Sequence, residues 1–377
     1  MLRTVVLAAA LLAGLPALAD EAFRDPQDGA FDASEFLLDK KGFLPVPVII
    51  TEPAVGYGAG AALVFFRESL RERASHVKPG EPLTPPDIYV AALAATENGT
   101  KVMGGGGLVT FDQDRYRWRG FVGLPDVNLD FYGVGGQTGT GERKIAYNVD
   151  GVISTQQVMR RLGQSNNWIV GRWIYLDLDA TFDPSRPQPV LPAPSRNVTS
   201  SGLGGSIEHD SRDNFFSAGA GWKGSLEAMF YSPSWASDNE YETYRALAFG
   251  YVPVGKDFIL GAKGDVRSAN GDVPFYQLPF IELRGVPVAR YQDRRTLASE
   301  FELRWNATPR WSFLGFVGSG RAWGSGDKAF GDAGTVTSGG VGFRYLVARR
   351  LGILAGLDIA KSAENTAIYI QAGSAWR

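Results

Sequence analysis

The sequence contains no cysteine and only two histidines, His76 and His209. Without cysteine no disulfide can hold an exported chain together, so its stability has to come from one large core or one closed barrel. The same scarcity leaves no set of soft ligands for zinc or iron, and we expect neither a metal nor another cofactor. His209 is followed directly by Asp210 and Ser211, and three consecutive residues do not by themselves make a catalytic triad. We therefore expect a protein that is not an enzyme.

The chain also lacks a strong net charge and, after its first residues, a long apolar run. Its 38 basic and 40 acidic side chains give a net charge of −2, which excludes the basic surface typical of nucleic-acid binding. Residues 1–19, MLRTVVLAAALLAGLPALA, join a basic Arg3 to a short apolar stretch and a small-residue exit. This layout is typical of a cleaved signal peptide, with a membrane anchor as the alternative. Beyond it, no apolar run is long enough to span a bilayer as a helix.

Helical periodicity is missing as well, and a two-residue alternation replaces it from about Val46 to the end. In residues 301–306, FELRWN, apolar side chains alternate with Glu302 and Arg304. Segments of this kind, each of about ten residues, recur about sixteen times between turn residues. Their length, aromatic ends and charged second face are typical of strands that cross a membrane around a watery lumen. The sequence therefore predicts an all-β fold, a transmembrane antiparallel β-barrel of about sixteen strands.

The same patterns divide the chain into three parts. We expect a signal peptide at 1–19, a short periplasmic N-terminal extension at 20–45 and an outer-membrane β-barrel domain at 46–377. If the first strand runs outward, the long connections near 125–142, 182–198 and 269–293 lie outside the cell. The expected location is the outer membrane of a Gram-negative bacterium.

Four pieces of the chain, in order, carry a resemblance to a known family. They are LPVPVIITEPAVGYGAGAALVFF at 44–66, DFYGVG at 130–135, HDSRDNFFSAGAGW at 209–222, and LRGVPVARY at 283–291 followed by SEFELRW and GFVGSGRAW. Together they resemble the barrel domain of the BamA/TamA bacterial surface antigen family, the outer-membrane assembly and translocation barrels. The resemblance covers roughly residues 40–377, and it implies that one outer loop folds back into the lumen.

The resemblance also implies site residues. Arg284 and Gly285 match the Arg-Gly pair that the family's loop places against the inner wall, where a charge needs a partner and glycine permits close approach. Glu302 alternates inward in the following strand and is the expected partner, with a solvated loop arginine as the alternative. The family's periplasmic turn motif falls on Asp210, Arg212, Asp213 and Asn214.

Several positions depart from the family's pattern. Val286 stands where members usually carry an aromatic residue, and Gly318 stands where an acidic wall residue is expected. The chain ends on Trp376-Arg377 instead of on the aromatic. Residues 20–45 are too short for one of the periplasmic domains that collect clients in the family. We therefore expect a short member without them, and a periplasmic accessory protein as a partner in their place.

The first strand is crowded by Pro45, Pro47 and Pro53, each of which removes a donor from a ladder. The last strand, near 365–376, has no proline, so the weakness lies on one side. We expect a lateral seam between these strands, marked by Val48, Pro53, Ile370 and Trp376.

The expected function is the insertion or translocation of protein, or of lipid, through this seam. A passive pore or structural barrel is the alternative, and an enzyme with its site at the rim is a third reading. The expected partners are outer-membrane lipid, an unidentified protein or lipid client, the accessory protein, and a second copy joined through the open edge. Nucleic acid is not among them.

Overall fold

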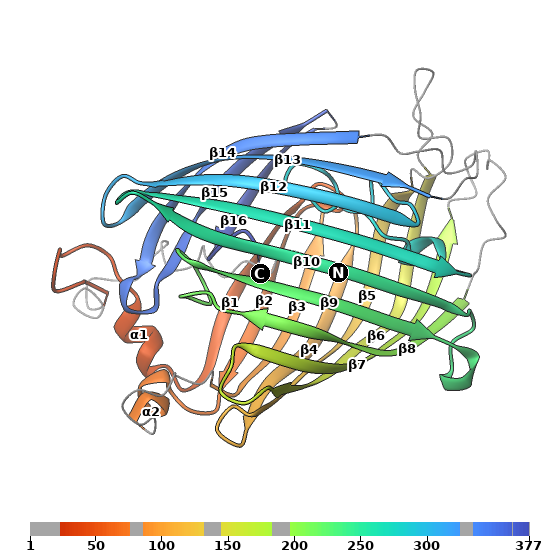
Figure 1. Ribbon diagram of the computed structural model, residues 1–377, viewed down its shortest axis with the longest axis horizontal. Helices are drawn as coiled ribbons and strands as arrows, with labels where there is room; N and C mark the ends of the chain where they lie inside the picture. The colour runs from red at the N-terminus through yellow and green to blue at the C-terminus, as the bar shows by residue number, and fades with distance from the viewer. Residues whose placement is uncertain are drawn as a thin grey trace.

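The computed structural model describes residues 23–75, 86–131, 145–182, 197–324, 335–363 and 365–376. Within these ranges, sixteen strands form one sheet, in which each strand is hydrogen-bonded to the next one in the chain. The sheet curls into a nearly closed barrel, as Figure 1 shows from the side. The predicted all-β antiparallel barrel of about sixteen strands is confirmed. In the same ranges, no helix has both the length and the apolar character needed to cross a bilayer.

The strands are β1 (Gly42–Glu52), β2 (Gly56–Phe66), β3 (Ile88–Thr96), β4 (Lys101–Phe111), β5 (Tyr116–Phe131), β6 (Ile145–Arg161), β7 (Asn167–Phe182), β8 (Asn197–Asp210), β9 (Gly221–Tyr231), β10 (Tyr241–Val254), β11 (Phe258–Gly271), β12 (Arg295–Asn306), β13 (Trp311–Trp323), β14 (Thr335–Ala348), β15 (Ile353–Ser362) and β16 (Thr366–Ala372). The short helices are α1 (Ser34–Asp39), α2 (Leu70–Ser75), η1 (Pro233–Trp235), η2 (Phe275–Gln277) and η3 (Arg349–Leu351).

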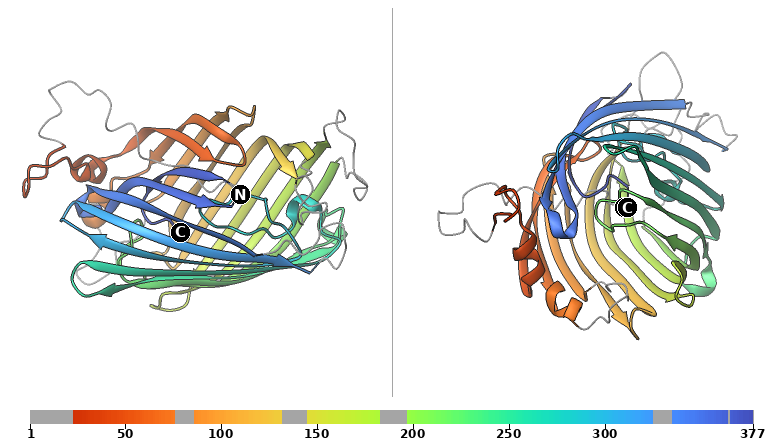
Figure 2. Two further views of the ribbon diagram at one scale, coloured as in Figure 1. Left: turned by 90° about the horizontal axis from the view of Figure 1, so that it is seen from above. Right: turned by 60° about the vertical axis from the view of Figure 1, so that its left-hand side comes forward.

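The two ends of the barrel differ in the chain segments that lie at each of them. β1 begins and β16 ends at the same end, because the strand number is even and neighbours are antiparallel. We call it the terminal end; α1 and α2 lie there, and the right-hand view of Figure 2 looks into the barrel from that side. The connection from β11 to β12, residues 272–294, starts at the opposite end, which we call the far end. The sequence-based orientation would make the terminal end periplasmic.

Side chains alternate across the barrel wall. In β12, Leu303 is 48% exposed and Trp305 is 47% exposed, whereas Glu302 and Arg304 are only 6% and 5% exposed. The two-residue period of a strand sends successive side chains to opposite faces, so the apolar set lies outside and the charged set lies inside. An apolar exterior over a charged interior is the arrangement of a barrel that is surrounded by lipid.

The inner wall differs between the two halves of the barrel. The half made by β11 to β15 carries charged side chains, which are Lys263, Asp265, Glu300, Glu302, Arg304, Arg344 and Asp358. The half made by β1 to β8 carries buried apolar clusters, together with charged side chains such as Arg172 and Glu208 on β7 and β8. One contains Val46, Val48, Ile50, Ala62 and Val64; the other contains Tyr147, Val149, Leu176, Leu178, Ala180 and Val198, and Tyr276 of η2 packs against it.

Some predicted boundaries need correction. β1 begins at Gly42 and not near Val46, so the barrel takes in the last residues assigned to the N-terminal extension. β5 continues to Phe131, so part of the connection predicted at 125–142 is strand. β6 has 17 residues, more than the ten or so predicted, because strands can extend beyond the bilayer. The signal-peptide prediction, most of the DFYGVG piece and most of the 182–198 connection lie outside the described residues.

Candidate functional site

The seam lies between β1 and β16. Every other neighbouring pair of strands in the described residues shares a ladder, but the hydrogen-bonded order of the sheet starts at β1 and stops at β16 without joining them. β16 has 7 residues and β1 has 11, so the last strand could cover only part of the first. This unpaired junction is where the described wall has the fewest backbone bonds to break.

The prolines of the first strand are placed differently from one another. Pro45 and Pro47 lie inside β1, where they stand opposite Leu63 and Ala61 of β2. A strand tolerates proline where the nitrogen faces away from its paired neighbour, and residues two apart face the same edge. Both missing donors therefore lie on the seam edge. Pro53 is a correction, because it lies in the turn after β1 and not in the seam.

Trp376 is also misplaced by the sequence prediction, because it lies in the lumen and not on the seam. β16 ends at Ala372, and Gly373, with φ at +84°, starts a turn that a residue with a side chain would strain. Trp376 is 4% exposed, its ring stacks on Tyr251 with centroids 5.5 Å apart, and its Nε1 donates to Glu300 Oε1 at 2.6 Å. The indole N–H of Trp376 thus has a hydrogen-bond partner inside the barrel, so Trp376 lies in the lumen and is not part of the barrel wall.

Val48 and Ile370 lie on opposite faces of the wall. Val48 is buried in the inner apolar cluster together with Val46 and Ile50. Ile370 shares the outward side of β16 with Ile368, which is 37% exposed, while Tyr369 between them is buried. A pair of cysteines at Val48 and Ile370 would therefore point apart, and any crosslink across the seam needs positions of one face.

The β11–β12 connection, residues 272–294, folds into the lumen, and we call it the lumen loop. Its Ile281, Leu283 and Val286 pack in a buried cluster against Ala298, Ala322 and Val336 of β12, β13 and β14. Gly285 has φ at +86°, and a Cβ there would lie 3.1 Å from Ala360 Cβ. Glycine is needed here both for the backbone conformation and for the close approach to β15.

Arg284 reaches three carboxylates inside the barrel. Its Nε donates to Glu300 Oε1 at 2.9 Å, its Nη1 donates to Asp358 Oδ2 at 3.0 Å, and its Nη2 lies 2.9 Å from Glu302 Oε2. The guanidinium also stands over the ring of Phe316, 3.6 Å from the centroid. All four partners are buried, so the charge of Arg284 is balanced by opposite charge and by an aromatic face.

The family pattern places an acidic wall residue at the position of Gly318. In this structure, Asp358 of β15 supplies that carboxylate to Arg284. Its carboxylate also accepts from Arg344 at 2.5 and 2.9 Å, which links two arginines through one fully buried acid. A Cβ at Gly318 would lie 2.9 Å from Leu283 Cδ2, so the missing side chain makes room for the lumen loop. The departure at this position is therefore compensated from another strand.

The lumen loop is bonded to both sides of the seam. On the β16 side, Gly285 N–H donates to the hydroxyl of Tyr369 at 3.0 Å. On the β1 side, Val288 N–H donates to Glu52 Oε1 at 3.1 Å. A few residues of backbone therefore connect the two strands that share no ladder, and the loop serves as an internal tie across the seam.

The β8–β9 turn, residues 211–220, carries the predicted turn motif. Asp210 accepts from Arg212 at 2.8 and 2.7 Å, and Asp213 Oδ1 accepts from Gly219 N–H at 2.9 Å. Asn214 Nδ2 donates to the carbonyl of Leu351 at 2.9 Å. The turn also meets the end of the chain, where Ser374 N–H donates to the carbonyl of Phe216 at 2.6 Å. Arg304 of β12 reaches the same turn, and its Nη2 donates to the carbonyl of Ala218 at 2.9 Å. The motif thus stabilises the conformation of a turn at the terminal end, and this turn contacts residues of the lumen.

Residues 23–41 form a second bridge across the seam, at the terminal end, and we call this segment the terminal clasp. On one side, Arg310 of the β12–β13 turn binds Asp25 at 2.6 Å, and also Asp28 and Asp32, each at 2.8 Å. On the other side, the segment pairs with α2 of the β2–β3 connection, where Nζ of Lys41, just after α1, lies 3.0 Å from Glu72. Arg71 of α2 also pairs with acids of α1. Nothing in the sequence pointed to these partners.

The terminal clasp should be sensitive to acid. A hydrogen bond from Arg310 holds the pKa of Asp28 well below its ordinary value, and hydrogen bonds from Arg350 and Arg71 lower the pKa of Glu35. Because these carboxyls have a lower pKa in the docked state, their contribution is complete above about pH 5 and is lost as the pH falls through about 4 and below. We expect tryptic cleavage in residues 23–41 to be slow at pH 7, and a dye on α1 to report undocking when the pH is lowered. An unchanged dye signal down to pH 2 would contradict this.

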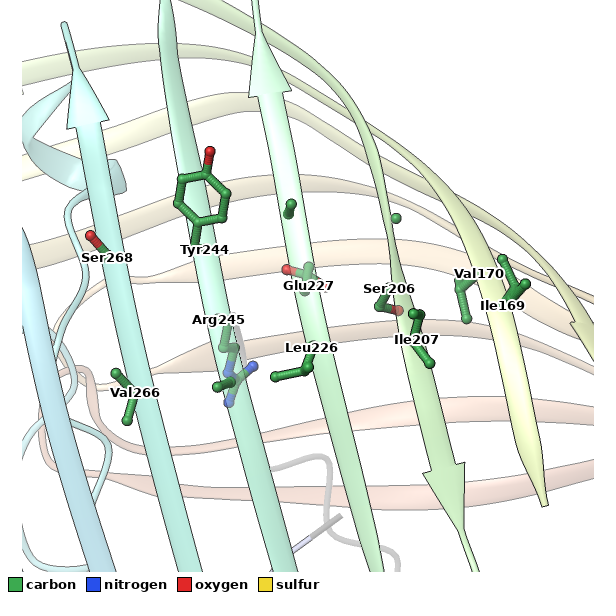
Figure 3. Close-up of a pocket in the computed structure, with 13 residues that line it drawn as sticks. Ile169, Val170, Ser206, Ile207, Leu226, Glu227, Tyr244, Arg245, Val266 and Ser268 are labelled. Atoms are coloured by element: carbon green, nitrogen blue, oxygen red, sulfur yellow. The ribbon is translucent and has the colours of Figure 1, made fainter.

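Two of the hollows lined by the described residues differ in position. One, of about 610 Å³, lies on the outer face over β7 to β11, and Figure 3 shows Leu226 and Val266 on the outward side of their strands while Arg245 points to the other side. Its outward residues include Ile169, Ile207, Leu226, Tyr244 and Val266. The other hollow lies in the lumen, between the lumen loop and the inner wall of β1 to β7. The outer hollow is part of the surface that lipid would cover.

Three parts of this arrangement were missed from the sequence. Glu300 lies two residues before Glu302 in SEFELRW and therefore faces the lumen as well, so the alternation could have identified it. Asp358 is the single acid among apolar residues in the β15 sequence ILAGLDIAKS, which was a weaker signal. The pairing of Arg310 with the terminal clasp had no signal, because the partners are more than 270 residues apart.

No protein-family model matches the chain, and no curated protein matches it. Among solved structures, it is similar to BamA from Haemophilus ducreyi lacking POTRA domains 1–3, with 12% identity and a TM-score of 0.58 over 88% of this chain and 69% of that one. It is also similar to CdiB from Acinetobacter baumannii, with 10% identity and a TM-score of 0.55 over 87% of this chain and 59% of that one. The chain thus spans about three fifths of the length of CdiB. At such identities the likeness shows the fold, which is a sixteen-stranded BamA-like barrel.

Proposed function

We propose that this protein is an outer-membrane barrel that inserts or translocates protein, or lipid, by opening laterally between β1 and β16. The observation that carries the proposal is the seam, where two adjacent strands share no ladder in the described residues. An unpaired strand edge is a template on which an incoming strand can add by backbone hydrogen bonds. Opening there costs fewer backbone bonds than separating any other pair.

The contents of the lumen favour the seam over the lumen as the working path. The lumen loop crosses the interior and holds Arg284 in a buried charge network, and Trp376 packs against Tyr251 and Glu300. A passive pore would need these segments to leave, which would expose paired charges and break the network. The likeness in fold to BamA and CdiB supports the same class, and a rim-site enzyme has no support from the geometry.

A crosslink across the seam tests the proposal. Cysteines would replace Ile370 and, in separate variants, Pro47 or Ile49, since these positions lie on the outward face of their strands. The chain has no native cysteine to interfere. In vesicles, the oxidised variant should lose at least about tenfold of its rate of client insertion, which corresponds to about 1.4 kcal/mol in the barrier, and a reductant should restore it.

The matched control locks a junction that is already paired. Ile49 stands directly opposite Ala59 in the β1–β2 ladder, and both are on the outward face. A disulfide between cysteines at Ile49 and Ala59 should leave the insertion rate unchanged. Full activity in the seam-locked barrel would overturn lateral opening and favour transport through the lumen.

Location is a separate prediction. The mature protein should fractionate with outer membranes, and in detergent gels the unheated barrel should run faster than the boiled one, since a closed sheet resists unfolding. Recovery as a water-soluble periplasmic species would contradict the proposal. The same preparation would reveal a periplasmic accessory protein or a second copy, the partners that we propose, by chemical crosslinking before extraction.

A further inference from the structure

The lumen cavity has a volume of about 170 Å³ and lies at the far end of the barrel. Its loop side is made by Tyr276, Phe280, Val288 and Ala289. Its wall side is formed by the inward residues of β1 to β7, among them Ile50, Val127, Leu129, Val149 and Leu178. An apolar hollow of this kind is unexpected inside a membrane barrel, whose lumen is normally polar.

Several polar groups in the lining are already engaged with the protein, whereas the hydroxyl of Tyr276 is buried without a hydrogen-bond partner among the described residues. Glu52 accepts from Val288 N–H at 3.1 Å, Thr96 Oγ1 donates to Asn98 at 2.8 Å, and Thr100 Oγ1 accepts from Asn128 N–H at 2.9 Å. A buried water needs two to four polar partners, and this lining offers few that are free to serve. Ordered water is therefore a poor occupant, and an apolar group is a better one.

The volume of the lumen cavity and its position next to β1 indicate which class of ligand it could bind. An engineered apolar cavity of about 150 Å³ stays dry and binds benzene, so about 170 Å³ suits roughly six carbons. Ile50 and Glu52, which line the cavity, belong to β1 and thus to the seam. The apolar groups closest to that edge in a membrane are the hydrocarbon chains of lipids.

We propose that the cavity between the lumen loop and the inner wall of β1 to β7 binds the end of an acyl chain of a membrane lipid, which enters beside β1. A chain end that leaves the bilayer for this cavity exchanges one apolar environment for another, so its transfer costs little hydrophobic free energy. The occupant also covers apolar wall that would otherwise face water in the lumen. This site does not depend on the assembly activity, because a barrel that inserts no client could still hold the chain.

Photolabelling tests the site directly. The full-length protein would be reconstituted in vesicles that contain a phospholipid with a diazirine near the end of one acyl chain, then irradiated and mapped by mass spectrometry. We expect adducts on inward residues such as Val127, Leu129 and Val149, in addition to the outward residues that lipid touches in any barrel. Adducts confined to outward residues would overturn the proposal. Inward labelling by a free diazirine fatty acid, but not by the phospholipid, would overturn the membrane lipid as the source.

A filled cavity is the matched variant. Ala94 lines the cavity, whereas Ala95, the next residue of β3, is exposed on the outer face. Ala94→Trp should reduce the inward adducts at least tenfold, and Ala95→Trp should leave them unchanged. Heat-dependent gel mobility would show that both variants fold. If Ala94→Trp fails to fold, Ala289→Phe fills the same cavity from the lumen loop, and persistence of inward adducts in the folded variant would overturn the proposal.

Discussion

Arg284→Ala is expected to cause the largest loss of stability of any single substitution in the lumen. The change removes the cation that Glu300, Glu302 and Asp358 share, and it leaves buried carboxylates without a counter-charge. Breaking a buried pair from one side costs about 3–5 kcal/mol, and water in the lumen lowers this figure. The variant should show a lower urea midpoint and a smaller folded band on unheated gels.

The control for this substitution is Arg321→Ala, because Arg321 lies on β13 with its side chain exposed. It should change the urea midpoint little. A double-mutant cycle with Glu300→Ala and another with Glu302→Ala would separate the two acids. Glu300 accepts from the Nε of Arg284 and also lies 2.9 Å from its Nη2, whereas Glu302 contacts only Nη2, so the coupling to Glu300 should be the larger. Additive effects in both cycles would show that the network does not stabilise the barrel.

Arg310→Ala is expected to release the terminal clasp. The side chain of Arg310 is 7% exposed, and Asp25 and Asp32, which it binds, are each 6% exposed. A hydrogen bond to a charged partner contributes about 1.5–3 kcal/mol, so the free energy of local opening should fall by at least that amount. Trypsin should then cleave at Lys40 or Lys41 at least about tenfold faster, since 1.4 kcal/mol is a factor of ten.

Arg115→Ala is the comparison for the clasp. Arg115 also lies in a turn at the terminal end and forms an ion pair of 3.6 Å with Asp112, but both side chains are more than half exposed. Such a pair contributes little, and cleavage at Lys40 should not change. If the clasp holds the seam closed, Arg310→Ala should also raise the yield of β1 crosslinks to a client. Equal cleavage in the two variants would show that Arg310 does not dock the segment.

The alternation of side chains was readable from the sequence because it is a local property. A strand turns successive residues to opposite faces, so the pattern around Glu302 and Arg304 predicted which side faces the lumen without knowledge of any partner. The Arg284-Gly285 pair was identified in a different way, through the resemblance of LRGVPVARY to the family's loop motif. The strand number also followed from local signals, because turn residues separate the segments.

The partners of those residues depended on the tertiary structure. Arg284 meets Asp358 across 74 positions of sequence and Arg310 meets Asp28 across 282, and only the closing of the sheet brings them together. The direction of the chain after Ala372 was likewise set by Glu300 and Tyr251, which offer Trp376 a partner and a stacking surface inside the barrel. Sequence patterns report which face a side chain occupies, whereas register and barrel closure decide what it meets, because those depend on free energies summed over many strands.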